Sequence, residues 1–315
     1  MIVVSSSSLF GIWLGLELNL LSFIPIINLN SDSKKTREAS VKYFLIQAIA
    51  SSVVIFFFMW FLLYSSSSIW NSRSFVLNCA LAAKIGLAPF HAWFPEVIDG
   101  VSWANSLILM TWQKISPIIV MSQMSKGPIV IFLALISAII GALGGLNQTS
   151  IRKILAFSSI SHIGWIMIII RLESSLWMDY LIIYFMLSFV SCVSFWLLNV
   201  NYLSQIFFIR DNRLKILVFS NLLSTGGIPP LIGFLAKIYG FQVIRHNLIF
   251  LIILIGRRLV NLFFYVRLCI SCFTISQRNF VHLTDKNIKK TIAINSLSML
   301  ITVGGLFPLG LLSLR

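Results

Sequence analysis

Ten apolar runs of about 20 residues each dominate this sequence, and mostly short segments separate them. A helix of about 20 apolar residues spans the hydrocarbon core of a bilayer, which is about 30 Å thick. Because lipid offers no hydrogen bonds to the backbone, each spanning segment must be a helix that satisfies its own N–H and C=O groups. The sequence therefore predicts an all-α bundle of about ten transmembrane helices. The runs cover residues 2–27, 41–64, 74–95, 103–123, 128–147, 150–170, 176–203, 214–243, 247–273 and 289–312.

The composition excludes the other broad classes of protein. Of the 315 residues only 10% are charged, and the mean hydropathy is +0.94. Soluble domains carry about 25% charged residues, and disordered chains need low hydrophobicity. The net charge of +15 does not indicate nucleic-acid binding, because the basic residues lie mainly in short loops. The longer loops, residues 28–40, 204–213 and 274–288, leave no room for a soluble domain.

The distribution of basic residues between alternate loops predicts the orientation. Loops on the cytoplasmic side of a membrane, or its equivalent, carry an excess of Lys and Arg. One set of loops holds thirteen such residues and the other holds five. We therefore expect the first loop to lie inside and both termini to lie outside. The thirteen are Lys34, Lys35, Arg37, Lys42, Arg152, Lys153, Arg210, Arg213, Lys215, Arg278, Lys286, Lys289 and Lys290.

Neither a targeting sequence nor a metal site is expected. The N-terminus has no basic segment, and Glu17 interrupts its apolar run, so a cleavable leader is not predicted. Synthesis in a bacterium or inside an organelle follows from this. The four cysteines fall within apolar runs, and the single CxxC has no second pair for zinc. They are Cys79, Cys192, Cys269 and Cys272.

Several ionisable residues lie deep in the apolar runs, where they are costly. Glu17, Lys84, Lys114 and Lys237 each have apolar sequence on both sides. An ionisable residue at the centre of a membrane helix costs about 2.5–3.5 kcal/mol on insertion scales, and such residues normally pair or face a wet cavity. The alternative is a long side chain that reaches the interface, which suits Arg267 near the end of its run. For the others we favour a polar pathway for protons or ions.

Two of these lysines lie beside breaks in their helices. Lys84 precedes Gly86, Pro89 and Pro95, and Lys237 follows the run Gly-Gly-Ile-Pro-Pro at residues 226–230. Proline removes a backbone donor and clashes with the preceding turn, so each helix should unwind near its lysine. Interrupted spans at corresponding positions are typical of transporters built from inverted repeats. The breaks fall in the third and eighth predicted spans, which are five spans apart. Because five is odd, the second repeat would cross the membrane in the opposite direction to the first. Two ordinary proline kinks would not predict a lysine beside each.

A polar stretch in the run 150–170 adds a titratable group. His162 follows Ser158, Ser159 and Ser161. Histidine titrates near neutral pH and can pass a proton through its two ring nitrogens. A lone histidine in a helix is also often a hydrogen-bonded packing residue. The sequence leaves a relay role and a packing role for His162 equally open.

Six motifs in order resemble the subunit 2 family of NADH dehydrogenase, the antiporter-like membrane subunits of respiratory complex I, in its animal mitochondrial form. The resemblance covers about residues 9–275. The motifs are residues 15–21, 38–44, 83–91, 111–117, 144–165 and 226–237.

The resemblance implies a role for five residues. Glu17 matches the intramembrane glutamate, and Lys84 matches the broken-helix lysine that pairs with it. Lys114 matches the central lysine, His162 a histidine on the connecting path, and Lys237 the lysine of the second broken helix. Together they imply a buried relay that carries protons across the inner membrane. The distance between Glu17 and Lys84 would then decide whether Lys84 keeps or releases its proton.

The resemblance also implies a setting for the chain. It would be a multi-pass protein of the mitochondrial inner membrane, with other membrane-arm subunits and phospholipids such as cardiolipin as partners. It would be one membrane domain, with a first repeat at 1–123 lacking its first helix, a second at 124–275, and a final span at 276–315. The flavin (FMN), iron–sulfur clusters and ubiquinone would belong to other subunits, since no phosphate loop or cysteine ligand set occurs here.

Arg257 and Arg258 do not fit this pattern. They lie mid-run without an acidic residue in the same run, where the family usually has small or hydroxyl residues. One interpretation is an added charged site or a bound anionic lipid. The other is translation with the wrong genetic code, because some mitochondrial codes read AGA and AGG as serine and AUA as methionine. The 47 isoleucines against 9 methionines fit that interpretation, which we favour.

Two rival functions remain possible at this level. A stand-alone cation/proton antiporter would share the architecture and would work without partners or electron transfer. A purely structural membrane spacer would leave Lys84 and Lys237 dry, unpaired and dispensable. The redox-linked subunit is favoured by the motif match, not by the spacing of the charges.

Overall fold

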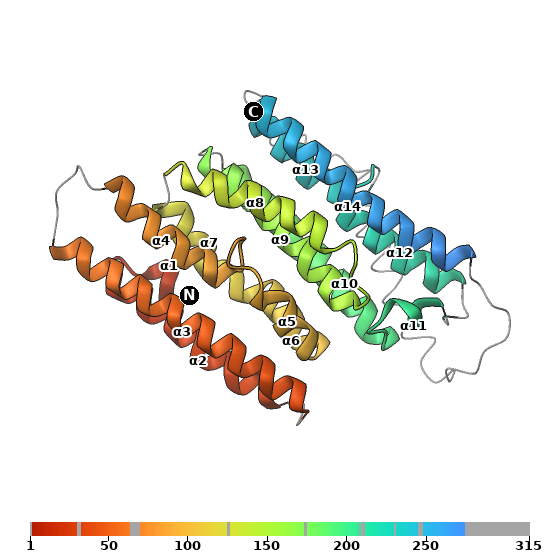
Figure 1. The fold of residues 1–315 in the computed structure, drawn as a ribbon, viewed down its shortest axis with the longest axis horizontal. Coiled ribbons are helices and arrows are strands. Elements are labelled where there is room, and N and C mark those ends of the chain that lie inside the picture. Colours follow the sequence, from red (N-terminus) through yellow and green to blue (C-terminus); the bar gives the residue numbers. More distant parts are fainter. Residues whose placement is uncertain are drawn as a thin grey trace. The chain divides into compact units, whose positions relative to one another are not determined.

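A computed structural model describes residues 2–29, 33–63, 70–124, 127–172, 175–207, 209, 212–229, 231–244 and 248–274 (Figure 1). Within these ranges the chain forms helices and no β-strand, and one isolated β-bridge joins Ser150 and Tyr202. The predicted all-α fold is confirmed. The helices are α1 (Ile2–Ser5), α2 (Leu9–Leu29), α3 (Lys34–Leu63), α4 (Trp70–Ile85), α5 (Trp93–Gly100), α6 (Trp103–Met110), α7 (Trp112–Met124), α8 (Ile129–Gly144), α9 (Ile151–Arg171), α10 (Leu176–Leu198), α11 (Leu203–Phe207), α12 (Asn212–Gly226), α13 (Ile232–Ile244) and α14 (Leu248–Thr274).

Nine of the ten predicted runs coincide with helices, and the tenth, 289–312, lies outside the described residues. In the described part, four helices are long and apolar enough to cross a membrane: α2, α3 over Lys34–Phe61, α9 and α10. Shorter apolar helical stretches lie at Phe75–Ile85, Ile129–Gly144, Leu214–Gly226 and Ile232–Ile244. Three of these belong to runs that the structure divides. The breaks at α4/α5 and α12/α13 were expected from the sequence.

Two further divisions were not predicted, and both depend on a hydroxyl side chain. The run 2–27 divides into α1 and α2 because the Ser8 hydroxyl accepts a hydrogen bond from the Gly11 N–H, at 3.1 Å, and so caps the new helix. The run 103–123 divides into α6 and α7 at Thr111. The Thr111 hydroxyl donates to the carbonyl of Leu107 at 2.8 Å, a contact that often bends helices.

The chain divides into two compact units. The first comprises residues 1–140 and 159–174, and the second comprises 141–158 and 175–315, so the division passes through α8 and α9. In the first unit α3 packs against α2, α4 and α5, and α4 packs against α7. In the second unit α12 packs against α10, α13 and α14.

Helix α9 is the most enclosed of the four long apolar helices. Protein covers 94% of its most apolar window, against 33% for α2, so α9 lies inside the protein and α2 leaves a face for lipid. Gly164 permits close packing between α9 and α8. A Cβ atom there would lie 2.8 Å from the Ala134 carbonyl oxygen and 2.6 Å from Ser137 Oγ. The polar residues of α9 are thereby held away from lipid.

Candidate functional site

The first broken helix ends at a glycine that no other residue could easily replace. Helix α4 ends at Ile85, and Gly86 follows with a φ of 82°, which L side chains rarely adopt. The N–H groups of Gly86 and Leu87 both donate to the carbonyl of Ala82, at 2.9 Å each. The chain resumes as α5 at Trp93. The predicted unwinding beside Lys84 is confirmed.

Side chains satisfy the carbonyl groups that this break frees. The Trp93 indole Nε1 donates to the carbonyl of Ala83 at 3.1 Å, and Gln47 Nε2 on α3 donates to the carbonyl of Lys84 at 3.1 Å. An unpaired backbone carbonyl in an apolar interior costs about as much as a lost hydrogen bond. The two donors therefore stabilise the interrupted helix in the interior of the first unit.

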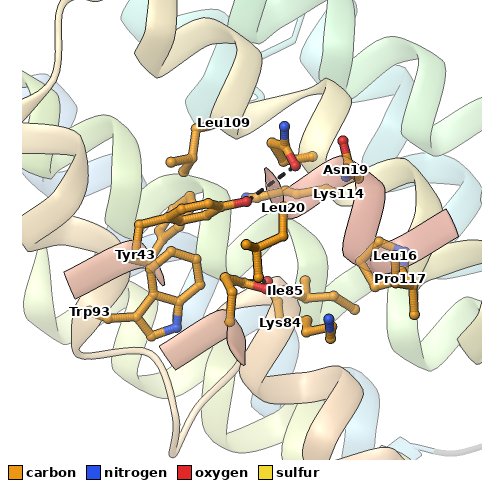
Figure 2. Close-up of a pocket in the computed structure, with 13 residues that line it drawn as sticks. Leu16, Asn19, Leu20, Tyr43, Lys84, Ile85, Trp93, Leu109, Lys114 and Pro117 are labelled. Carbon is orange, nitrogen blue, oxygen red and sulfur yellow. Dashed lines mark hydrogen bonds between the residues drawn. The ribbon is translucent and has the colours of Figure 1, made fainter. Parts of the chain in front are cut away.

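Lys84 and Lys114 line the same cavity in the first unit (Figure 2). The cavity volume is about 20 Å³, room for one water molecule, since one requires about 10–15 Å³ on this measure. The Tyr43 hydroxyl donates to Gln113 Oε1 at 3.3 Å across it. The lining residues are Leu16, Asn19, Leu20, Tyr43, Gln47, Lys84, Ile85, Trp93, Phe94, Leu109, Gln113, Lys114 and Pro117.

The Lys114 side chain is only 2% exposed, and its ammonium contacts groups inside the protein. Its Nζ donates to Ser159 Oγ of α9 at 3.1 Å and lies 4.2 Å from the centre of the Phe94 ring. An ammonium over an aromatic face is stabilised by the ring quadrupole. No acidic side chain is needed for these contacts. Lys114 thus points into the protein and does not extend toward the membrane surface.

Glu17 lies on the helix that faces Lys84 across the cavity. Glu17 is half-buried on α2, and within the described residues its buried Oε2 atom has no hydrogen-bond partner. Lys84 is 7% exposed. In the described part of the chain the predicted pair therefore does not form an ion pair. The neighbours Leu16, Asn19 and Leu20 of the same helix line the cavity.

The second broken helix also ends beside a glycine of positive φ, but there the lysine follows the break. Helix α12 ends at Gly226, and Gly227 follows with a φ of 77°. The Gly227 N–H donates to the carbonyls of Leu223 and Ser224, at 2.9 Å each, and the chain resumes as α13. Lys237 of α13 is 4% exposed, and its Nζ donates to the carbonyls of Gly226 and Thr225. A lysine ammonium thus caps the open end of α12.

His162 lies in the first unit and is 5% exposed. It follows Ser159, the partner of Lys114, by one helical turn. Glu17, Lys84, Lys114 and His162 therefore belong to one unit, and Lys237 belongs to the other. Tyr43, Gln47 and Gln113 were not among the expected site residues. The two glutamines could have been found from the sequence, because an amide inside an apolar run is costly to bury without a partner.

Arg257 and Arg258 are poorly accommodated in α14. Arg257 is 8% exposed, and all three of its guanidinium nitrogens are buried without a hydrogen-bond partner in the described part of the chain. Arg258 donates from Nη2 to the carbonyl of Gly227, and its positive charge repels that of Lys237. Its guanidinium lies 5.1 Å from the Phe234 ring centre. Arg267, by contrast, is exposed.

We expect serine at positions 257 and 258 of the protein made in the cell. A guanidinium buried without partners costs several kcal/mol, whereas a serine hydroxyl is neutral and can bond a carbonyl of the preceding helical turn. Mass spectrometry of the peptide spanning both positions tests this. The control is Arg152, whose Nη2 donates to Asn201 Oδ1 at 3.0 Å and which we expect to remain arginine. Arginine found at 257 and 258 would contradict the expectation.

The fold and the site define the class of protein: a helical membrane bundle of the antiporter-like type, with two spans broken at glycine and a buried lysine beside each break. Residues 6–262 match the family model described as NADH:quinone oxidoreductase/Mrp antiporter, TM. The chain is 42% identical to NADH-ubiquinone oxidoreductase chain 2 of Anopheles gambiae, over 99% of this chain and 94% of that protein. It is 40% identical to the chain 2 of Aedes aegypti, over 99% and 92%. The chain belongs to the family of NADH-ubiquinone oxidoreductase chain 2, as the motifs indicated.

A solved structure shows the same fold. Respiratory complex I from Thermus thermophilus, with bound aureothin, contains a chain that superposes with a TM-score of 0.83. The match covers 98% of this chain and 75% of that chain, at 21% identity. At that identity the similarity supports the fold alone. The predicted antiporter-like bundle and the multi-pass membrane class are confirmed.

Proposed function

We propose that this chain is a core membrane subunit of proton-pumping NADH:ubiquinone oxidoreductase and carries protons through a buried relay. Family membership supports the first part. The observation that carries the second is the cavity lined by both Lys84 and Lys114, beside the part of α2 that holds Glu17. The relay comprises Glu17, Lys84, Lys114, His162 and Lys237.

The open Glu17–Lys84 pair is the feature that could control proton release. A nearby carboxylate stabilises the charged form of a lysine. At an effective dielectric constant of about 20, increasing the separation of two charges from about 4 Å to about 8 Å weakens their attraction by roughly 2 kcal/mol. A factor of ten in proton occupancy corresponds to about 1.4 kcal/mol. A small movement of α2 therefore suffices to transfer the proton of Lys84 toward Lys114.

The energy for transport must come from other subunits. Moving one charge against a membrane potential costs about 2.3 kcal/mol per 100 mV. The redox chemistry of FMN, iron–sulfur clusters and ubiquinone belongs, in this proposal, to neighbouring subunits and not to this chain. The other membrane-arm subunits are its partners, and phospholipids such as cardiolipin surround it.

The proposal extends to location and internal repeats. We place the chain in the mitochondrial inner membrane with both termini on the intermembrane-space side, which the excess of basic residues in alternate loops supports. We divide it into repeats at 1–123 and 124–275 and a final span at 276–315. The shared construction of the two breaks, a glycine of positive φ with a buried lysine nearby, supports two repeats.

Isolation of the complex tests the assignment. We expect this chain in NADH:ubiquinone oxidoreductase purified from mitochondria of the source organism, in equal amount with the other membrane subunits by quantitative mass spectrometry. Vesicles containing that complex should take up protons only when both NADH and ubiquinone are supplied. Cation/proton exchange by vesicles containing this chain alone, with no NADH, would instead support the stand-alone antiporter.

A further inference from the structure

One face of α3 reaches the segments that carry both lysines of the first unit. Tyr43 and Gln47 lie four residues apart on this helix, and residues at that spacing share a face. They are 3% and 6% exposed, and both line the cavity that Lys84 and Lys114 also line. Figure 2 shows Tyr43 and the two lysines around it. Helix α3 thus brings two buried polar side chains to the wall of this cavity.

Gln47 holds the segment that carries Lys84. In a continuous helix the carbonyl of Lys84 would accept from the N–H four residues later, but α4 ends at Ile85. Gln47 Nε2 takes that place and donates to this carbonyl at 3.1 Å. Because the bonded carbonyl and the lysine side chain are attached to the same Cα atom, the hydrogen bond fixes where the side chain enters the cavity.

Tyr43 holds the segment that carries Lys114. Its hydroxyl donates to Gln113 Oε1 of α7 at 3.3 Å, and Gln113 directly precedes Lys114 in the chain. The rings of Phe23 and Trp93 lie beside the Tyr43 ring, with centres 5.3 Å and 5.9 Å away. These two neighbours restrict the orientation of the phenol, so its hydroxyl is a fixed anchor for α7.

The separation of the two lysines matters because their cavity is small. Its volume is about 20 Å³, room for one water molecule. A proton donor and its acceptor must lie within about 2.6–3.2 Å of each other, or exchange the proton through one water. A misplacement of about 1 Å can slow a reaction by roughly 10²-fold. The contacts that hold both segments therefore decide whether a proton can pass between Lys84 and Lys114.

We propose that Tyr43 and Gln47 are positioning residues that together set the separation of Lys84 and Lys114 across the cavity; this rests on the proposed function. Gln47 acts on the end of α4, and Tyr43 acts on α7 through Gln113. Neither residue carries a proton in the transfer. Because one helix bears both, the distance between the two lysines does not depend on the unwound segment after α4 alone.

Removing either hydrogen bond tests the proposal in the assembled complex. Gln47→Met keeps the length of the side chain and loses the amide, and Tyr43→Phe loses a single oxygen atom. In each variant we expect NADH-driven proton uptake per assembled complex to slow roughly tenfold or more. The kcat for NADH oxidation should fall with it, and the KM for NADH should stay unchanged. A purely structural role would lower the amount of complex and leave the rate per complex unchanged, which would overturn the proposal.

A double variant tests the hydrogen bond between Tyr43 and Gln113. Gln113→Met removes the acceptor, as Tyr43→Phe removes the donor. If this bond positions Lys114, the variant with both changes pumps no more slowly than either single variant, because each change already breaks the bond. Independent, additive slowing by the two changes would contradict the role of the bond.

The matched control is Ser51→Ala. Ser51 lies one turn beyond Gln47 on α3 and is equally buried, but its hydroxyl donates within its own helix, to the carbonyl of Ala48 at 2.9 Å. This variant should pump normally. Should Gln47→Met fail to assemble, Tyr43→Phe decides, since it removes only one atom.

Lys114→Ala, measured on the same vesicles, separates this proposal from the proposed function. If Gln47→Met and Tyr43→Phe pump normally and Lys114→Ala does not, the positioning role is wrong and the proposed function stands. If all three variants pump normally, the lysine relay itself is wrong.

Discussion

Replacing Lys114 with alanine abolishes NADH-driven proton uptake and leaves the assembled complex largely intact; this is the largest functional effect that we expect. Lys114 lies between the cavity that it shares with Lys84 and the hydroxyl of Ser159. Alanine offers no group that can hold a proton there. The fold should tolerate the loss, because burying an ammonium is costly and its removal relieves that cost. Proton uptake and NADH oxidation, measured on the same vesicles, test the expectation.

Lys42→Ala is the matched control for Lys114→Ala. Lys42 is exposed and pairs with Glu38 and Glu96, at 2.8 Å each. Exposed ion pairs contribute about 0–1 kcal/mol, so we expect normal pumping and near-normal stability. An unchanged number of protons per electron in Lys114→Ala would refute the central role of this lysine.

Replacing Gly233 with alanine should prevent the chain from accumulating in the complex. A Cβ atom on Gly233 would lie 1.7 Å from the carbonyl oxygen of Ser224 and 2.8 Å from its carbon. These are backbone atoms of α12, so α13 would have to move away from the broken end that Lys237 caps. Overpacking costs about 1–3 kcal/mol, and more where the backbone must shift. The amount of the chain in the purified complex, by quantitative mass spectrometry, measures the effect.

Gly256→Ala is the matched control for Gly233→Ala. A Cβ atom on Gly256 in α14 would meet nothing within 4 Å. Alanine stabilises a helix interior by about 0.5–1 kcal/mol relative to glycine, so the variant should accumulate normally. Equal abundance of the Gly233 and Gly256 variants would show that the α12/α13 break does not need this close approach.

The helix divisions show where prediction from sequence succeeded and where it failed. Proline and glycine near Lys84 and Lys237 act on the backbone of their own segment, so both breaks were foreseen. The divisions after Ser5 and at Thr111 were not, because each depends on which carbonyl or N–H a small hydroxyl chooses. Serine and threonine are common in membrane helices that continue unbroken, and their identity alone does not decide between the two outcomes.

The sequence by itself determined the all-α membrane bundle, the two broken spans and the lysines beside them, because hydropathy, proline and glycine act locally along the chain. Only the tertiary structure decided that Lys84 and Lys114 line one cavity, that Gln47 and Trp93 satisfy the carbonyls freed at the first break, and that Lys114 donates to Ser159 of α9. These contacts join residues that are distant in the sequence. Their partners are set by how the helices pack against one another, and apolar helices of similar hydropathy can pack in many ways.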